Sequence, residues 1–150
     1  MKIKDILNVK GSKVWTIQGT QTLREASKIL VSQGIGALPV LDPKSGHVTG
    51  IVSERDIVRA GIDERGRTPD QILVKEIMTA QVIFGTPGDE MGQVMEVMTR
   101  RRIRHIPILD SGRLAGIISI GDVVKAILED SKHEIESLKE YLYGPGAILA

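Results

Sequence analysis

The sequence predicts a mixed α+β protein in which two tandem βαββα units pack as a pseudo-twofold pair, followed by a C-terminal helix. Three observations predict this fold class. The sequence contains an internal repeat, each copy combines helical and strand periodicity, and one copy alone would be only marginally stable. We expect the first unit at residues 8–66, the second at 72–130 and the helical extension at 131–143.

The repeat consists of two stretches that recur in the same order. Residues 36–42, Gly-Ala-Leu-Pro-Val-Leu-Asp, match residues 104–110, Arg-His-Ile-Pro-Ile-Leu-Asp. Residues 50–58, which contain Gly-Ile-Val-Ser-Glu-Arg-Asp, match the segment that begins at Gly116. The copies differ in length only in the turn between these stretches, where a hairpin tolerates insertion.

Each copy is expected to begin with a short strand and an amphipathic helix. The strands are predicted at 14–17 and 82–84, and the helices at 22–33 and about 89–101. The first helix has the apolar spacing of one buried face, at Leu23, Ala26, Ile29 and Leu30. Either Thr20 or Thr22 can cap its start, and Gly34 ends it.

A β-hairpin and a second helix complete each copy. Strands at 37–41 and 48–53 flank a Pro/Gly turn, and 106–109 with 114–119 repeat this pattern. The second helices are expected to open at Asp56 and Asp122. A polar linker with Gly and Pro, residues 61–69, suits an exposed crossover between the copies.

The last helix carries an apolar seam of heptad type that is interrupted at Ser131 and ends before Gly144. Its members are Val124, Leu128, Ile135, Leu138 and Leu142. Two interpretations stay open at this stage. The seam either joins two copies of the chain or packs back on its own unit.

Composition excludes several classes of function. The chain has no cysteine, so disulfides, thiolate metal sites and a cysteine nucleophile are excluded. A net charge of +1 and 3% aromatic residues make nucleic acid an improbable partner. The sequence shows no signal peptide and no membrane span, so a cytoplasmic location is expected. The three histidines lack metal-ligand spacing, and no acid/base pair stands out, so the chain is not expected to be an enzyme.

The repeated motifs resemble those of CBS-domain pairs, also called Bateman modules. The resemblance rests on residues 50–60, 104–108 and 116–125, and it is greatest to small stand-alone bacterial members with a C-terminal helix. It covers nearly the whole chain. One such motif alone is weak, but two copies in the same register are specific.

The chemistry of the Ser-x-x-Asp pairs can also be interpreted without the family resemblance. A strand that ends at Ser53 and a helix that contains Asp56 bring a hydroxyl, a carboxylate and unpaired helix N–H groups together, as do Ser119 and Asp122. A carboxylate there can accept both hydrogens of a ribose diol. The structural alternative is that these residues only cap helices, which is worth about 1 kcal/mol. The family resemblance favours ribose binding at both copies.

The resemblance also implies positions for the adenine. They lie on the early strand and around the hairpin proline of each copy: Thr16, Ala37 and Leu38 in the first, and Phe84, His105, Ile106 and Pro107 in the second. Phe84 departs from the small hydroxyl residue that the family often has there. The aromatic ring could stack on a base or exclude it.

Phosphates are expected at the basic run 100–105. Arg104 and His105 are the first choices and Arg55 is a further one, although cations at a helix end are also favoured by the helix dipole. The first copy has neutral Gly36 and Ala37 at the positions of Arg104 and His105, so we expect unequal sites with the better phosphate site in the second copy.

The function implied is a regulatory module that binds an adenine nucleotide and acts in trans on a partner protein that the sequence does not identify. AMP, ADP, ATP and NAD are the expected ligands, S-adenosylmethionine is a weaker one, and no catalytic cofactor or metal is expected. The family resemblance also implies a homodimer through the CBS pairs. The alternative is a structural dimerisation module whose binding sites are vestigial.

Overall fold

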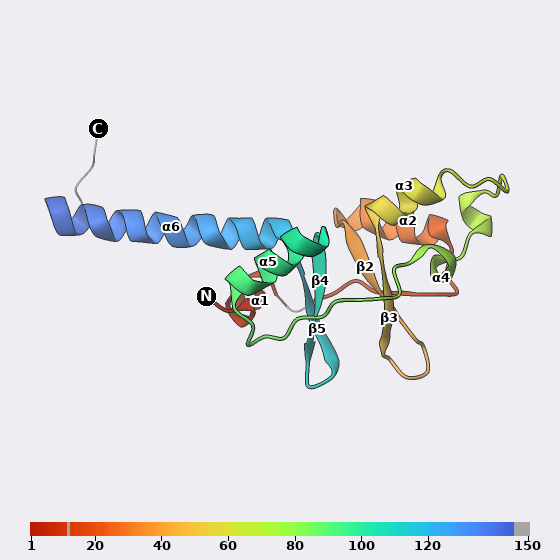
Figure 1. Ribbon diagram of the computed structural model, residues 1–150, viewed down its shortest axis with the longest axis horizontal. Helices are drawn as coiled ribbons and strands as arrows, with labels where there is room; N and C mark the ends of the chain where they lie inside the picture. Colours follow the sequence, from red (N-terminus) through yellow and green to blue (C-terminus); the bar gives the residue numbers. More distant parts are fainter. Residues whose placement is uncertain (12, 146–150) are drawn as a thin grey trace.

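The computed structural model describes residues 1–11 and 13–145, and it confirms two mixed helix-and-strand units with a C-terminal helix (Figure 1). The first unit contains β1 (Ile17–Gln18), α2 (Leu23–Gln33), β2 (Ala37–Leu41), β3 (Val48–Ser53) and α3 (Glu54–Ala60). The second contains α5 (Met91–Arg101), β4 (His105–Asp110), β5 (Arg113–Ser119) and α6 (Ile120–Tyr143). Three further short helices are α1 (Ile3–Lys10), η1 (Pro69–Gln71) and α4 (Val74–Ile77).

The two hairpins repeat each other residue by residue. In the first sheet, of order β1-β2-β3, Ala37 pairs with Ser53. In the second sheet, β4-β5, His105 pairs with Ser119 in the same register. Each antiparallel pair also has its irregularity at the equivalent place, after Val40 and after Ile108. The repeat in the sequence is therefore a repeat of strand pairing.

The expected early strands are only partly formed. β1 covers Ile17–Gln18 and lies parallel to β2, instead of starting at Val14. The predicted strand 82–84 was wrong, since only Gly85 bridges to Ile108. The backbone of Thr79 pairs with Ile51 of the first unit, with N–O distances of 3.0 and 2.9 Å. Because this contact holds the chain at the first sheet, the residues that follow reach β4 only at Gly85.

Helix starts follow the capping chemistry of the sequence. Of the two possible caps for α2, Thr22 is the one used, with its hydroxyl accepting from the Glu25 amide at 3.2 Å, and Gly34 ends the helix at φ +62°. The second helices begin two residues earlier than expected, at Glu54 and Ile120. Ser53 and Ser119 are the N-cap residues, and the two aspartates occupy the third helical position. A hydroxyl that can accept from the helix N–H groups explains the earlier start.

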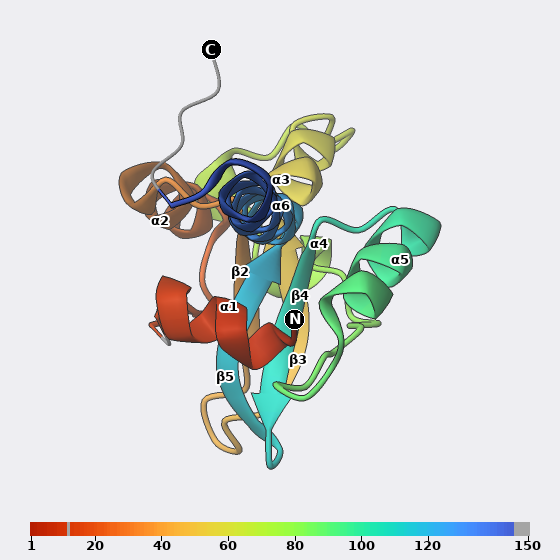
Figure 2. The same cartoon turned by 90° about the vertical axis from the view of Figure 1, so that its left-hand side faces the viewer.

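Helix α1 was not anticipated from the sequence. Its apolar residues Ile3, Ile6 and Leu7 have helical spacing, and they pack into the core of the second unit rather than the first. Figure 2 shows α1 lying in front of β5. A Cβ atom at Gly116 would lie 2.5 Å from Leu7 Cδ2, so a glycine in β5 leaves room for this helix.

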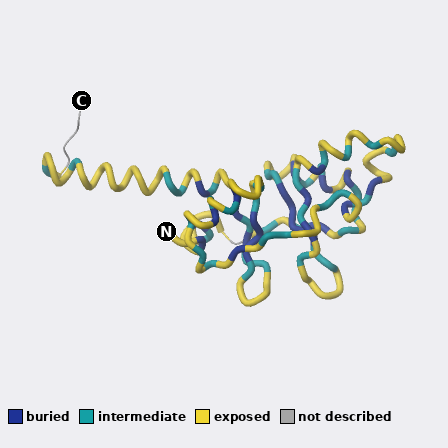
Figure 3. The backbone as a smooth tube through the Cα atoms, in the orientation of Figure 1, coloured by how far each residue is buried: buried dark blue, intermediate teal, exposed yellow. Residues whose placement is uncertain are grey.

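Two apolar cores result, one under each sheet. The first contains Ile17, Ala26, Leu30, Leu38, Val40, Val52 and Val74. The second contains Ile3, Ile6, Val94, Met98, Ile106, Ile108, Ile118 and Val123. In Figure 3 the buried segments concentrate in the two sheets and the helix faces that cover them.

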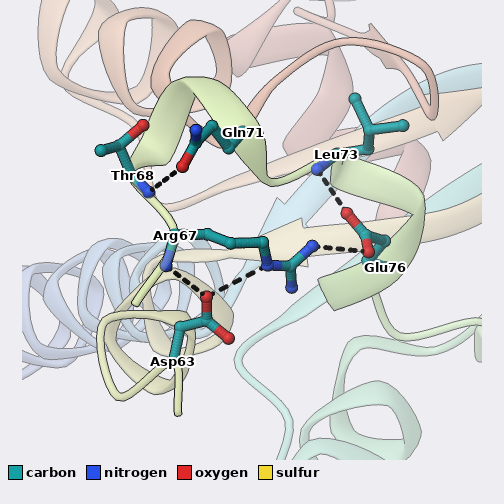
Figure 4. A network of polar contacts seen from close by, with 6 residues as sticks. All are labelled: Asp63, Arg67, Thr68, Gln71, Leu73 and Glu76. Carbon is teal, nitrogen blue, oxygen red and sulfur yellow. Dashed lines mark hydrogen bonds and ion pairs between the residues drawn. The ribbon is translucent and has the colours of Figure 1, made fainter. Parts of the chain in front are cut away.

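The linker between the units is pinned by ion pairs. Arg67 donates from Nε to Asp63 at 3.1 Å and from a terminal nitrogen to Glu76 at 2.9 Å (Figure 4). Glu76 in turn accepts from the Leu73 amide at 2.8 Å. The crossover is exposed as expected, but these contacts fasten it to the start of α4.

Helix α6 leaves the body after its first two turns. Val123 is buried and Ala126 and Ile127 pack on the second core, whereas the helix beyond them extends away from both units (Figure 1). The seam residues Leu128, Ile135, Leu138 and Leu142 are all exposed, so the seam does not pack back on its own unit. None of the helices in the described ranges is long and apolar enough to cross a membrane.

We expect Ile108→Ala to lower the free energy of unfolding by about 2–5 kcal/mol, because it opens a cavity around a side chain with no exposed surface. Urea unfolding followed by circular dichroism measures the loss. Val31→Ala is the control, since Val31 is 83% exposed and its truncation should change stability by less than about 0.5 kcal/mol. Equal effects of the two substitutions would contradict the assigned core.

Candidate functional site

A pocket of about 320 Å³ lies where the two units meet, at the lower end of the range of small-molecule sites. Three segments form it: the corner between β3 and α3, the connection at 79–83 and the end of α5 with the start of β4. Its lining is Gly36, Ile51, Ser53, Glu54, Arg55, Asp56, Arg59, Thr79, Gln81, Val82, Ile83, Arg102, Ile103, Arg104 and His105.

Asp56 supplies a carboxylate to this pocket while it fastens the corner. Its Oδ2 accepts from the backbone amide of Ser53 at 2.9 Å and from the Ser53 hydroxyl at 3.0 Å. The residue is only 7% exposed, and no ion pair to it exists among the residues that the structure describes. The lining thus includes a carboxylate without a protein counter-ion.

The basic residues of the second unit line the pocket of the first unit's Ser-x-x-Asp pair. Arg104 and His105 therefore line the same pocket as Asp56 of the first unit, although the sequence analysis assigned them to the site of the second copy. The reason is geometric: a Cβ at Gly36 would lie 2.9 Å from His105 Cε1, so the starts of β2 and β4 face each other across the interface. Arg55 lines the same pocket, as do Arg59 and Arg102, which sequence analysis did not select.

His105 lies half-buried between the two Ser-x-x-Asp corners. Burial of the imidazole is the largest cause that lowers its pKa below the ordinary value, and the nearby positive charge of Lys10 acts in the same direction. The carboxylates of Asp122 and Glu54 oppose this shift without cancelling it. The neutral imidazole is therefore the favoured form.

The second corner differs because a lysine occupies its carboxylate. Lys10 Nζ donates to Asp122 Oδ2 and to the Ile117 carbonyl, both at 2.7 Å. Burial alone would raise the pKa of Asp122, but hydrogen bonds from Lys10 and from the Ser119 amide lower it overall. Lys10 was missed from the sequence, because it lies in a helix that was not predicted.

Comparison with known proteins agrees with this two-unit architecture. The sequence model of the family described as CBS domain matches residues 3–63 and again 74–129. The chain belongs to the CBS domain family. Its relatives include the CBS domain-containing protein CBSX3, mitochondrial, of Arabidopsis thaliana, which is 34% identical over 149 residues and is matched over 95% of this chain and 72% of that protein.

Solved CBS structures share the fold. The CBS-domain containing protein ATU1752 from Agrobacterium tumefaciens superimposes with a TM-score of 0.80 and 42% identity, over 85% of this chain and 99% of that one. PAE2072 from Pyrobaculum aerophilum, solved with AMP, has a TM-score of 0.75 at 25% identity, covering 89% and 99%. The pair of MJ0100, solved with 5′-methylthioadenosine and S-adenosyl-L-methionine, has a TM-score of 0.75 at 27% identity, covering 87% and 98%.

The other residues predicted for this CBS pair do not line the pocket. Thr16 is half-buried just before β1, and Phe84 is 39% exposed beyond the pocket-lining connection. The hairpin residues are all buried in the two sheets: Ala37, Leu38, Ile106 and Pro107. The expected adenine positions on the strands therefore remain predictions. The pocket instead offers Thr79, Gln81, Val82 and Ile83 from the connection between the units.

The depressed pKa of His105 predicts a pH dependence of stability. Below about pH 6.5, the ordinary histidine pKa, the unfolded chain takes up the proton more readily than the folded one, so stability is lost as the pH falls. We expect His105→Gln to flatten the decline in unfolding free energy between pH 6.5 and 5. His47→Gln, in the exposed hairpin turn, should leave the slope unchanged. A wild-type slope in His105→Gln would contradict the assignment.

Proposed function

We propose that the pocket at Asp56 binds the ribose and phosphates of an adenine nucleotide, and that this CBS pair is a regulatory module rather than an enzyme. The observation that carries the proposal is the composition of one cleft. It combines the unpaired carboxylate of Asp56 with four arginines and His105 in about 320 Å³. These are the groups that a ribose diol and a phosphate chain require.

Different residues of the cleft are suited to the ribose, the phosphates and the base. The Asp56 carboxylate accepts hydrogens from the vicinal hydroxyls, in charge-assisted hydrogen bonds. Arginine guanidinium groups donate in a fork that matches phosphate oxygens, and they come from both units: Arg55, Arg59, Arg102 and Arg104. Ile51, Val82 and Ile83 supply apolar surface for a base. A ligand held in this way touches both units and can alter how they meet.

The basic lining also orders the ligands. AMP, ADP, ATP and NAD carry negative phosphates, whereas S-adenosylmethionine carries a sulfonium cation that the arginines repel. The PAE2072 structure contains AMP, which supports a preference for ligands with phosphate. Both ligands of the MJ0100 structure contain adenosine, which supports an adenosine-containing ligand. The output of binding is a changed contact between the two units, read by a partner protein in trans in the cytoplasm.

Removing the carboxylate tests the ribose assignment. Isothermal titration of nucleotide-stripped protein with ATP and AMP should show that Asp56→Asn weakens binding at this pocket about 10- to 100-fold, the value of a lost charge-assisted hydrogen bond. Asp89→Asn is the matched control, because Asp89 also accepts from a backbone amide, that of Thr86, at 2.8 Å, and it lies outside the pocket.

Two results would contradict this proposal. No heat and no thermal shift at millimolar ATP, AMP and NAD would leave the chain as a ligand-free dimerisation module. An unchanged nucleotide affinity in Asp56→Asn would show that the ribose does not bind to this carboxylate.

We also propose that two chains pair, with α6 contributing to the CBS-pair dimer. With the polar Ser131 included, the seam positions follow alternating spacings of four and three from Val124 to Leu142, and the apolar side chains among them are all exposed. A second copy of the same seam is complementary by symmetry, because an isologous contact buries the same apolar surface on both helices.

A charge in the seam should separate the two chains. We expect Leu138→Glu to lower the molar mass measured by light scattering from dimer toward monomer at micromolar concentration, because an unpaired carboxylate would be buried between the helices. His133→Glu adds the same charge on the opposite face of α6 and should leave the mass unchanged. A dimer that persists in Leu138→Glu would show that α6 is dispensable for pairing.

A further inference from the structure

The two units exchange equivalent short helices. Residues 3–7 of α1, Ile-Lys-Asp-Ile-Leu, match residues 74–78, Val-Lys-Glu-Ile-Met, which are α4 and the residue that follows it. Each segment places its last side chain over the equivalent glycine of a hairpin. A Cβ at Gly116 would lie 2.5 Å from Leu7, and a Cβ at Gly50 would lie 2.6 Å from Met78. α1 therefore packs against the second sheet in the same way as α4 packs against the first.

In this alignment Lys10 is equivalent to Gln81, because Lys10 follows Leu7 by three residues and Gln81 follows Met78 by three. Gln81 lines the cleft of Asp56 and brings no charge to it. Lys10 reaches Asp122 and the Ile117 carbonyl at 2.7 Å. Both corners have the reciprocal bonds from the serine amide to the aspartate carboxylate and from the aspartate amide to the serine hydroxyl. Among the residues that the structure describes, only the carboxylate of Asp122 has an ammonium group on it.

We propose that Lys10 is the specificity determinant of the second corner, where it acts as an internal competitor for the ribose diol. The inference rests on the proposed function of the first cleft. An ammonium group on Asp122 uses the acceptor that a diol needs, so the chain binds one nucleotide, at Asp56. The second corner accepts a ribose only when Lys10 leaves it.

The environment of the pair supports a lasting contact rather than a passing surface one. The side chains of Lys10 and Asp122 are 35% and 23% exposed, and Lys10 ends a helix whose apolar face is anchored by Ile3 and Ile6 in the core. A charge-assisted bond in partial burial is stronger than an exposed ion pair. The apparent affinity of the second corner is its intrinsic affinity multiplied by the fraction of time that Lys10 is displaced.

Reciprocal substitutions test the proposal on the full chain. Isothermal titration with ATP should give one nucleotide per chain for the wild type and two for Lys10→Gln, whose second corner then resembles the first. Gln81→Lys should weaken the first site at least about 10-fold, because it brings a lysine to Asp56. Lys4→Gln, on the exposed side of α1, is the control and should match the wild type.

Removing each carboxylate assigns the sites. The extra site of Lys10→Gln should survive Asp56→Asn and disappear with Asp122→Asn. One nucleotide in both wild type and Lys10→Gln, or two in both, would overturn the role of Lys10 while leaving the proposed function intact. Binding by Lys10→Gln alone would support Lys10 and overturn the first cleft. Binding by neither protein would overturn both.

Discussion

In each unit, a serine and an aspartate three residues apart hold the corner where a strand becomes a helix. Asp56 accepts from the Ser53 amide at 2.9 Å, and Asp122 accepts from the Ser119 amide at 2.8 Å. Each serine hydroxyl accepts in return from the aspartate amide. This reciprocal pair satisfies donors that a helix start otherwise leaves unpaired, and it fixes a carboxylate at the interface of the units. The binding chemistry and the capping alternative are therefore not rivals, because one carboxylate can serve both.

The two corners share the Ser-x-x-Asp pair but have different neighbouring residues. At the start of the second hairpin His105 stands where the first has Ala37, and it fits against Gly36 because that residue has no side chain. Arg102 and Arg104, which come directly after α5, line the same pocket as Asp56. On the other side, Lys10 neutralises Asp122. Each corner is thus surrounded by residues that other parts of the chain bring to it.

The exchange of α1 and α4 ties the two units to each other. Ile3 and Ile6 belong to the core of the second unit although they precede the first, and Val74 belongs to the first core although it follows that unit. Truncation of either helix would expose apolar surface on the opposite unit. The linker contacts of Arg67 reinforce this arrangement by tying the crossover to α4.

The sequence by itself determined the repeat, the two hairpins, helix α2 with its Gly34 end, and the two Ser-x-x-Asp corners. These features are local, so spacing and turn chemistry suffice to predict them. Only the tertiary structure decided which corner receives Arg104 and His105, because that depends on how β2 and β4 face each other. It also decided that residues 82–84 line a pocket instead of forming a strand, and that Lys10 reaches Asp122 from the far end of the chain. Contacts between residues more than a hundred positions apart leave no periodic trace in the sequence.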